Sequence, residues 1–386
     1  MRIAQFADTF LPVVDGVGRV VHNYATTLCD KGHECYVIAP AADTGYRGGY
    51  PFELVDYMGA PVPGSPQYKA GLTVLDRHFH QRMALLKFDI VHAHTPFIAG
   101  QEALHTATKQ KIPLVGTFHS KYYDDFYAAT GGAALLASIG VKFVVDFYEH
   151  CDEVWAVSES SAEVLNEYGY KGDIKVMENG TEIRKRTQED RARAVEMFGL
   201  AGDEPVLLFV GQQNWKKNII KVLEAAALLK KRGQHFKLVL AGQGPDENEI
   251  EKKIRELDIA DITVLTGHIT ENAILDGLYQ RASLFVFPSL YDNAPMVLRE
   301  AAAMGTPGVL VRGSCAAEIV QDGVNGLLVA DDSADIAQVL LHNMNDPQRL
   351  KALGECARNS IPIAWGAIID AAVDRYSKLV NDNHKR

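Results

Sequence analysis

The chain has 386 residues, a hydrophobic content of 47% and a charged content of 23%, a composition typical of a globular protein with room for two domains. No apolar run reaches the roughly 18–20 residues that span a bilayer, and a net charge of −10 disfavours general nucleic-acid binding. The five cysteines lack metal-ligand spacing and no signal peptide precedes the first strand, so we expect a cytoplasmic protein with free thiols.

The first half of the chain alternates short apolar strands with helices. Residues 2–7 predict a strand and residues 18–31 a helix, which Gly32 ends. β-branched runs separated by helical stretches indicate a parallel sheet with crossover helices. The further strands predicted for this sheet are 35–40, 90–95, 113–119, 153–158 and 174–177.

A second series of the same kind begins after a linker, ENGTEI. The fold class is therefore α/β, with two Rossmann-like parallel-sheet domains, and we expect ligands in a cleft between them, at the carboxyl ends of both sheets. The strands predicted for the second sheet start near residues 205, 237, 262, 284, 306 and 326, and a final helix starts near residue 365.

The segment 289–307, SLYDNAPMVLREAAAMGTP, places two carboxylates eight positions apart. Asp292 falls in a loop after a strand, and Glu300 falls about one turn inside a helix that starts near Met296. The exposed amides of such a helix start bind anions, so a diphosphate flanked by two hydroxyl-bearing groups would suit this arrangement. Surface acids on an ordinary strand–loop–helix remain the alternative.

Residues 15–18, Asp-Gly-Val-Gly, lie between the first strand and helix. Glycines there let the backbone approach a ligand closely, although a plain tight turn is the alternative. Gly16 and Gly18 are followed by Val21 where a G-x-G-x-x-G fingerprint needs glycine, which disfavours a dinucleotide dehydrogenase.

His119 ends the predicted strand 113–119, where its imidazole would face the cleft or make a structural hydrogen bond. His92 and His94 also lie near a strand end. We interpret both as mostly structural, with only His94 facing the same way as His119.

Three further loops follow strands of the second series. The first, GQQNWKKN (211–218), holds a basic pair that either binds an anion or is a solvated surface pair. The others are the turn GQGP (242–245) and GHI (267–269).

Together these motifs resemble the retaining, nucleotide-sugar-dependent glycosyltransferases of the GT-B fold, whose E-x7-E signature matches Asp292 and Glu300. The resemblance spans nearly the whole chain. It implies an acceptor-side N-terminal domain, 1–180, to which the final helix, 365–386, crosses back. It implies a nucleotide-sugar-binding domain at 181–364.

The resemblance also implies a role for each motif. Glu300 would accept hydrogen bonds from the ribose, Asp292 from the hexose, and His119 of the G-T-x-H run would contact the sugar or align the acceptor. Lys217 would neutralise the diphosphate of the leaving group. The donor-binding residues implied are Gly16, Gln212, Lys217, Gly242, His268, Ile269, Asp292, Asn293, Ala294, Pro295, Met296, Val297 and Glu300.

This chain departs from the family pattern in two places. Asp292 stands where the family usually has Glu, and Gln212 stands where it usually has Arg, for which Lys216 or Arg299 would compensate. No D-x-D run is present, so we predict no required metal and no cofactor beyond the donor substrate.

We expect a hexose, most simply glucose from UDP-glucose, to pass to an acceptor hydroxyl. The sequences DTFLPVVDGVGRV (8–20) and GSPQYK (64–69) are similar to diacylglycerol glucosyltransferases, and the apolar stretch 122–148 would lie on a membrane or bind a lipid, or else be a buried helix pair. Peripheral contact with the inner face of the membrane is thus one expectation. The alternatives are a soluble acceptor, a nucleotide-sugar epimerase and a non-catalytic nucleotide-sugar-binding protein.

Overall fold

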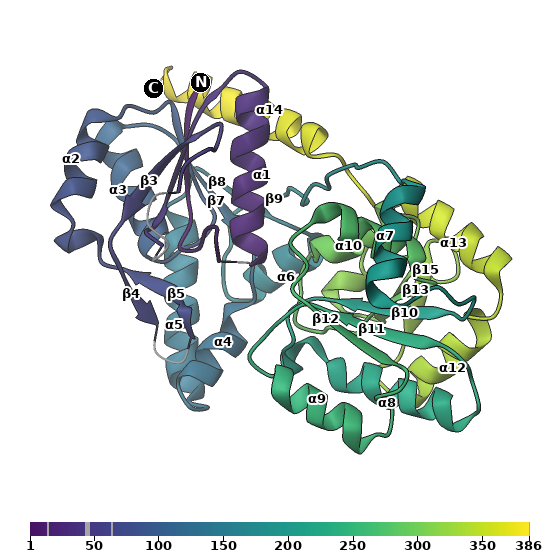
Figure 1. Cartoon of the computed structure of the whole chain (residues 1–386). Coiled ribbons are helices and arrows are strands. Elements are labelled where there is room, and N and C mark those ends of the chain that lie inside the picture. Colours follow the sequence, from purple (N-terminus) through teal and green to yellow (C-terminus); the bar gives the residue numbers. More distant parts are fainter. Residues whose placement is uncertain (14, 43–46, 63–64, 386) are drawn as a thin grey trace. The chain divides into compact units, whose positions relative to one another are not determined.

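The computed structural model describes residues 1–13, 15–42, 47–62 and 65–385, so Val14 and Gly64 of the motifs quoted above lie outside it. The chain divides into two compact units. Unit 1 comprises residues 1–180 and 365–386, and unit 2 comprises residues 181–364. Each unit is an α/β layer structure around its own parallel sheet, which confirms the predicted fold class (Figure 1).

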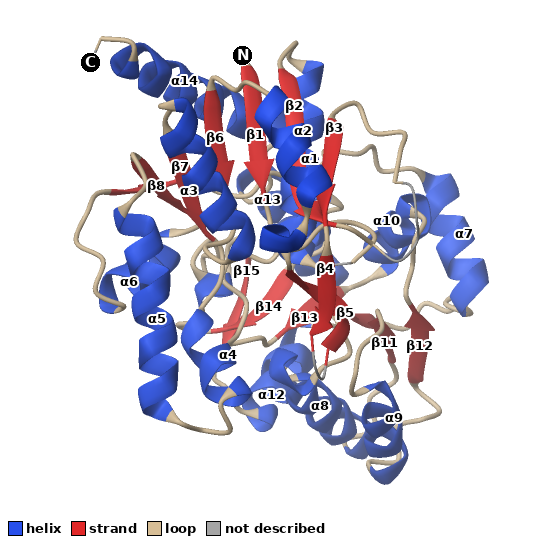
Figure 2. Ribbon diagram, turned by 90° about the vertical axis from the view of Figure 1, so that its left-hand side faces the viewer, coloured by secondary structure: helices blue, strands red, loops and turns tan. Residues whose placement is uncertain are grey.

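The sheet of unit 1 has the strand order β3-β2-β1-β6-β7-β8-β9, and all pairings are parallel. Figure 2 shows β8, β7, β6, β1, β2 and β3 side by side in this order. The order reverses between β1 and β6, which makes the carboxyl ends of these strands a switch point of the kind that binds ligands. The strands are β1 (Arg2–Phe6), β2 (Glu34–Pro40), β3 (Glu53–Tyr57), β6 (Ile90–Ala93), β7 (Leu114–Phe118), β8 (Glu153–Ala156) and β9 (Ile174–Val176).

Three strands of unit 1 were not predicted from the sequence. β3 extends the edge of the sheet, and β4 (Gly59–Val62) pairs with β5 (Ser65–Gly71) in a separate antiparallel hairpin. The segment is rich in Gly and Pro, which indicates turns rather than strands when no partner is known.

The helices of unit 1 pack on its sheet. They are α1 (Gly16–Asp30), α2 (Arg77–Leu85), α3 (Ile98–Gln110), α4 (Tyr122–Ala129), α5 (Ala134–Glu149), α6 (Glu159–Glu167) and α14 (Trp365–Asn383), with a short 3₁₀ turn, η1 (Thr73–Leu75). Asp15 caps α1 by accepting a hydrogen bond from the Gly18 amide at 2.6 Å.

The C-terminal helix α14 belongs to unit 1, as the resemblance implies. It packs beside α1, where Lys31 forms an ion pair with Asp370 at 2.6 Å (Figure 1). Further along α14, Arg375 Nε donates to Glu153 at 2.8 Å. The ring of Tyr376 stacks on Trp155, and both side chains are fully buried. α14 therefore completes the core of unit 1.

The sheet of unit 2 has the order β12-β11-β10-β13-β14-β15, again all parallel, with its switch point between β10 and β13. The strands are β10 (Val206–Val210), β11 (Lys237–Ala241), β12 (Thr263–Gly267), β13 (Leu284–Phe287), β14 (Gly308–Val311) and β15 (Gly326–Val329). The central strands are buried on both faces, which explains why they read as unbroken apolar runs.

Helices cover both faces of the second sheet (Figure 1). α8 packs against α9 and α12, whereas α10 packs against α7 and α11, and α11 against α13. The helices are α7 (Gln188–Phe198), α8 (Ile219–Lys231), α9 (Glu247–Glu256), α10 (Asn272–Arg281), α11 (Met296–Ala303), α12 (Ser333–Asn343) and α13 (Pro347–Ser360), with 3₁₀ turns η2 (Trp215–Lys217) and η3 (Cys315–Ala317).

Candidate active site

In unit 2, two loops meet at the switch point of the sheet. One follows β10 and carries Lys217, and the other follows β13 and carries Asp292. Lys217 Nζ donates to Asp292 Oδ1 at 2.5 Å, and both side chains are largely buried, with 15% and 20% of their surface exposed. The fold thus brings Lys217, which is predicted to contact the diphosphate, next to Asp292, which is predicted to contact the hexose. The two residues are 75 positions apart in the chain.

The second oxygen of Asp292 is held by Ser289. The Ser289 hydroxyl donates to Asp292 Oδ2 at 2.6 Å and accepts from the backbone amide of Tyr291 at 3.3 Å. Ser289 is fully buried, so its position is set by the end of β13. Asp292 is therefore held through both carboxylate oxygens, one by a cation and one by a hydroxyl.

Lys217 is placed by an unusual backbone turn. Asn218, the next residue, has a φ of 60° and lies between η2 and α8. Its side-chain nitrogen Nδ2 donates to the Pro288 carbonyl at 3.1 Å, which ties the β10 loop to the β13 loop, and to Asp331 Oδ1, which follows β15, at 2.8 Å. Asparagine tolerates the left-handed conformation well, so the backbone conformation explains why asparagine follows Lys217.

Lys216 and Arg299, the two residues expected to compensate for Gln212, differ in their surroundings. Lys216 is exposed and its Nζ lies 5.3 Å from the centre of the Tyr291 ring, as does Lys217 Nζ. Arg299 is buried, and its Nη1 donates to the Ile361 carbonyl at 2.7 Å. Of the two, Lys216 is the cation beside the Lys217–Asp292 pair. Gln212 itself is exposed.

The glycines of the neighbouring loops allow close packing of the strand ends. Gly242 has a φ of 133°, and a Cβ there would lie 1.9 Å from the Gly211 carbonyl oxygen. The Gly242 amide donates to the Gly267 carbonyl at 2.9 Å, so the loops after β10, β11 and β12 form one continuous surface. Next to Gly267, His268 is exposed and Ile269 is half-buried.

α11 begins directly after the Asp292 loop. Its cap residue is Pro295, which offers no side-chain oxygen to the first amides of the helix. Orphan amides at a helix start carry partial positive charge and favour an anion. The predicted donor-binding residues of this segment lie on both sides of the cap: Asn293 is buried, and Ala294, Pro295, Met296 and Val297 are half-buried.

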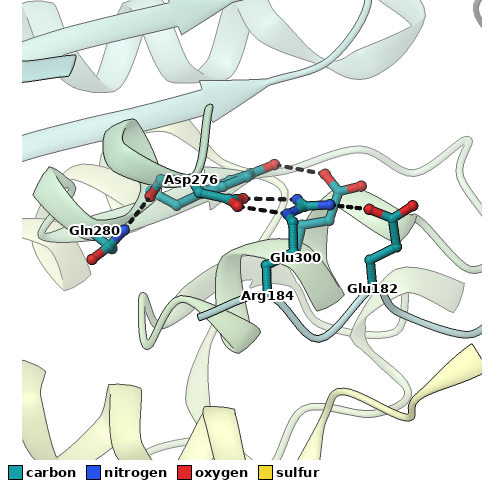
Figure 3. Close-up of polar contacts among 6 residues, drawn as sticks. Glu182, Arg184, Asp276, Gln280 and Glu300 are labelled. Atoms are coloured by element: carbon teal, nitrogen blue, oxygen red, sulfur yellow. Dashed lines mark hydrogen bonds and ion pairs between the residues drawn. The ribbon is translucent and has the colours of Figure 1, made fainter. Parts of the chain in front are cut away.

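Glu300 lies inside α11, as predicted, and only 7% of it is exposed. Tyr279 of α10 donates its hydroxyl to Glu300 Oε2 at 3.3 Å. Figure 3 shows Arg184 beside Glu300, although the guanidinium bonds elsewhere: Nε and Nη2 bind the two oxygens of Asp276 at 2.6 and 2.8 Å. The glutamate is therefore held at the edge of an ionic cluster.

Arg184 remains charged in this cluster. Burial opposes its charge, but the hydrogen-bonded Asp276 outweighs burial and raises the pKa of the guanidinium, with Glu182 and Glu300 adding to the effect. Glu182 also accepts a hydrogen bond from Arg184 Nη1 (Figure 3). Three carboxylates thus surround one cation.

In unit 1, the predicted loop at the start of α1 leaves its backbone accessible. Gly16 is the first residue of α1 and is exposed, and a Cβ added there would meet nothing within 4 Å. Gly18 is buried, and a Cβ there would lie 3.3 Å from Phe10 Cα. Gly16 thus has room beside it for a ligand, whereas Gly18 serves the packing of the helix.

His119 follows β7 at the carboxyl edge of unit 1, and its Nε2 lies 3.0 Å from Nδ1 of His94. Burial lowers the pKa of His119 to about 3, so the imidazole is neutral at physiological pH. His92 lies on this same face, with its ring centre 4.1 Å from that of His94, so the expectation that only His94 faces this way was wrong.

Sequence reasoning missed Ser289 and Tyr279, which bond the predicted carboxylates, and Arg184, which lies beside Glu300. Ser289 lies within the quoted segment and could have been found from its spacing to Asp292. The other two come from distant segments and need the fold. In the described part of the chain, no group of three or more His, Cys, Asp or Glu is placed to hold a metal ion, and metal independence stays a prediction.

Two family models match the chain in succession. Glycosyltransferase Family 4 matches residues 14–185, and Glycosyl transferases group 1 matches residues 190–360. The boundary between the matches falls within a few residues of the start of unit 2. Together they cover most of both units.

Relatives cover most of the chain at modest identity. The alpha-monoglucosyldiacylglycerol synthase of Streptococcus pneumoniae is 28% identical over 356 residues, 88% of this chain and 78% of that protein. The protein of the same name from Acholeplasma laidlawii is 24% identical over 397 residues, 100% and 99% of the two chains. A GDP-mannose-dependent alpha-mannosyltransferase of Corynebacterium glutamicum is 25% identical over 351 residues, 88% and 79% of the chains.

Solved structures of glycosyltransferases share the fold over nearly the whole chain. Anabaena Alr3699/HepE in complex with UDP and glucose matches with a TM-score of 0.78 and 18% identity, covering 98% of this chain and 99% of that one. The sucrose-phosphate synthase of Thermosynechococcus elongatus matches with a TM-score of 0.83 and 20% identity, covering 99% of each chain. With its family 4 domain in unit 1 and its group 1 domain in unit 2, the chain belongs to the GT-B glycosyltransferases and is a hexosyltransferase.

Proposed function

We propose that this enzyme transfers glucose from UDP-glucose, with retention of the anomeric configuration, to the hydroxyl group of a membrane lipid such as diacylglycerol. Unit 2 binds the donor and unit 1 binds the acceptor. The observation that best supports a lipid acceptor is a stripe of exposed apolar side chains on α5. The relatives named as alpha-monoglucosyldiacylglycerol synthases support the same choice of sugar and acceptor.

The α5 stripe consists of large apolar side chains that face solvent at helical spacing. The four residues and their exposed fractions are Leu135 (76%), Leu136 (52%), Ile139 (55%) and Phe143 (44%). The opposite side of α5, including Val144 and Tyr148, is buried, so the stretch 122–148 is a helix pair with one covered and one uncovered side. An exposed apolar group of this size is typical of a surface that meets a membrane or another apolar ligand.

The stripe also begins near the predicted acceptor side of the sheet. α4 starts three residues after His119, at the carboxyl edge, and α5 runs back from Ala134. A lipid whose chains lie against the first turns of α5 would hold its head group towards this edge. This position supports a lipid rather than a soluble acceptor.

A second exposed apolar group lies at the carboxyl end of β3. Its members are Met58 (41%), Leu72 (38%), Val74 (87%) and Leu75 (69%), and the Leu72 amide donates to the Met58 carbonyl at 2.7 Å. Residues 69–87 hold four basic side chains and one acidic, whereas residues 1–180 as a whole hold 14 and 21. A local basic and apolar surface of this kind suits anionic lipid. Among the residues that the structure describes, no helix is long and apolar enough to cross a bilayer.

The reaction assigns a task to each residue of the candidate site. The bond between the glucose C1 and the diphosphate breaks, and a bond forms between C1 and the acceptor oxygen on the same face. The acceptor proton passes to the departing phosphate, so the products are the glucolipid and UDP. Lys217 and the amides at the start of α11 stabilise the charge that develops on the diphosphate, while Asp292 and Glu300 position hexose and ribose.

The test is a donor screen by nucleotide release. UDP-glucose, UDP-galactose and GDP-mannose are offered to the full chain with diacylglycerol in anionic vesicles or with soluble sugars and inositol phosphates. We expect UDP release only with UDP-glucose and vesicles, and an α-linked product by NMR. A β-linked product, or faster release with a soluble acceptor, would refute the retaining mechanism or the lipid acceptor, respectively.

The stripe is tested with a matched pair of substitutions. Ile139→Glu places a charge on α5, and Met197→Glu places one on α7 of unit 2, where Met197 is 60% exposed. We expect only the first to weaken vesicle binding and glucolipid formation, about tenfold or more, because a buried carboxylate is costly in an apolar layer. Equal behaviour of the two variants would contradict the lipid surface.

A further inference from the structure

A row of hydrogen-bonded side chains runs along the carboxyl edge of unit 1. Gln5 Oε1 lies 2.7 Å from His94 Nε2, and His94 Nδ1 lies 3.0 Å from His119 Nε2. The three residues come from neighbouring strands, because β1 pairs with β6 and β6 with β7. Gln5 and His94 are fully buried, and His119 is the member of the row that is partly exposed.

The hydrogen bond between Gln5 and His94 determines which ring nitrogens of His94 and His119 carry a proton. The Gln5 carbonyl oxygen has no hydrogen, so His94 Nε2 must carry the proton of that bond. A neutral His94 then has a bare Nδ1, which accepts from Nε2–H of His119. We propose that Gln5, acting through His94, is a positioning residue that fixes His119 in the Nε2–H tautomer, so that His119 Nδ1 accepts a hydrogen bond from a hydroxyl group of the substrate.

The row must be neutral for this logic to hold, and burial favours that state. It lowers the pKa of His94 well below the ordinary range, and it lowers that of His119 to about 3. A charged His94 would have N–H groups at both ring nitrogens. Its Nδ1 would then donate to His119 Nε2 instead of accepting from it. At neutral pH the row therefore carries one proton per ring.

His92 is a useful contrast on the same face. Its Nδ1 lies 2.6 Å from the Tyr376 hydroxyl, and its Nε2 lies 2.6 Å from the Thr117 hydroxyl. Each hydroxyl can donate or accept, so neither bond dictates a tautomer. The ring of His92 packs against that of His94, and Tyr24 meets both edge-on, which holds the His94 ring in place.

Nitrogen NMR of the full chain labelled with ¹⁵N-histidine tests the proposal without substrate. We expect His119, assigned with His119→Asn, to show a single neutral tautomer with Nδ1 unprotonated. The exposed His342 of unit 2 should instead show the averaged signal of two exchanging tautomers. A protonated Nδ1 on His119, a charged ring, or an averaged signal would overturn the proposal, and the wild-type spectrum alone decides this.

Two substitutions of Gln5 then test the cause. Gln5→Leu removes the acceptor and should give an averaged signal, whereas Gln5→Glu places a carboxylate beside His94 Nε2, favours a second proton on that ring and should take His119 out of the Nε2–H tautomer. The same single tautomer in Gln5→Leu would show that Gln5 does not fix it.

The effect of Gln5 on the reaction rests on the proposed function, and it is measured separately through kcat and the affinity for UDP. Because Gln5 lies in unit 1, Gln5→Leu should lower kcat about tenfold, the equivalent of one hydrogen bond, while UDP affinity stays unchanged. Gln5→Glu, which favours a charged His94, should lower kcat as well. An equal loss of UDP affinity would mean a merely structural defect. If no glucosyl transfer is found at all, the proposed function fails while the tautomer result stands.

Discussion

Lys217 Nζ and Asp292 Oδ1 are 2.5 Å apart, so the main cation of the candidate donor site is paired with its own carboxylate. Both groups are largely buried, and Ser289 holds the other oxygen of Asp292. A diphosphate that takes over Lys217 must compete with this carboxylate, and the released Asp292 can then accept hydrogen bonds from sugar hydroxyls. Under the proposed function, donor binding would exchange the partners of two groups that neutralise each other beforehand.

Removal of the Lys217 amine should cost most of the activity. Lys217→Ala eliminates the charge that we propose stabilises the leaving diphosphate, and we expect kcat to fall on the order of a hundredfold or more. Initial rates of UDP release from UDP-glucose measure this loss. Lys252→Ala, which removes an exposed lysine of α9, serves as the control. A folded Lys217→Ala enzyme with near-normal turnover would rule out the assignment.

Transfer should not require a divalent metal. In the proposed function, Lys217 and the amides at the start of α11 take the place of the metal ion of other transferases, so activity should survive saturating EDTA. The rate is measured before and after chelation and again with added magnesium or manganese. Loss of activity with EDTA and its return with either metal would disprove this prediction.

The two carboxylates should separate nucleotide binding from sugar transfer. Glu300→Gln removes an acceptor for the ribose, so it should weaken UDP and UDP-glucose alike, because both contain the ribose. Asp292→Asn should lower transfer but leave UDP affinity no weaker, since only the sugar contact is lost and Lys217 gains freedom. Calorimetric titration with UDP and rates with UDP-glucose measure the two effects.

Equal losses of UDP affinity in the two variants would remove the support for separate roles. Ser289→Ala is an informative companion, because it leaves Asp292 in place and removes only the hydroxyl on Oδ2. It should mimic Asp292→Asn in transfer more weakly, by a few-fold, and should leave UDP binding unchanged.

The sequence was sufficient for the general arrangement because local signals dominate it. Apolar strand runs, the glycines after them and the eight-residue spacing of Asp292 and Glu300 all act within short segments. The ligand-holding contacts are of another kind. Lys217 reaches Asp292 across 75 residues, and Tyr279 reaches Glu300 across 21. Such contacts depend on strand order, which the sequence alone did not provide.

The histidine row shows the same limit on a smaller scale. The position of His119 at a strand end could be predicted, but its bond to His94 depends on β6 and β7 being neighbours in register. Only this pairing shows that the side chains at 92, 94, 117 and 119 lie on the same face of the sheet.

Acid should destabilise unit 1 through His119. The folded-state pKa of His119, about 3, lies below the ordinary value near 6.5, so the unfolded chain binds a proton in this range that the folded chain does not. Stability is therefore fully present above pH 6.5 and falls as the pH drops towards 3, by at most about 1.4 kcal/mol per pH unit for this residue. His119→Asn has no proton to bind and should lose less stability on acidification.

The measurement is the difference in Tm between wild type and His119→Asn, followed from pH 7 to pH 4.5. Buried Asp8 and Asp15 have raised pKa values, which act in the opposite direction, but they are common to both proteins and cancel in the difference. Parallel curves for wild type and His119→Asn would mean that His119 takes up its proton in the folded enzyme as readily as in the unfolded chain. That result would also remove the neutral histidine row on which the tautomer of His119 depends.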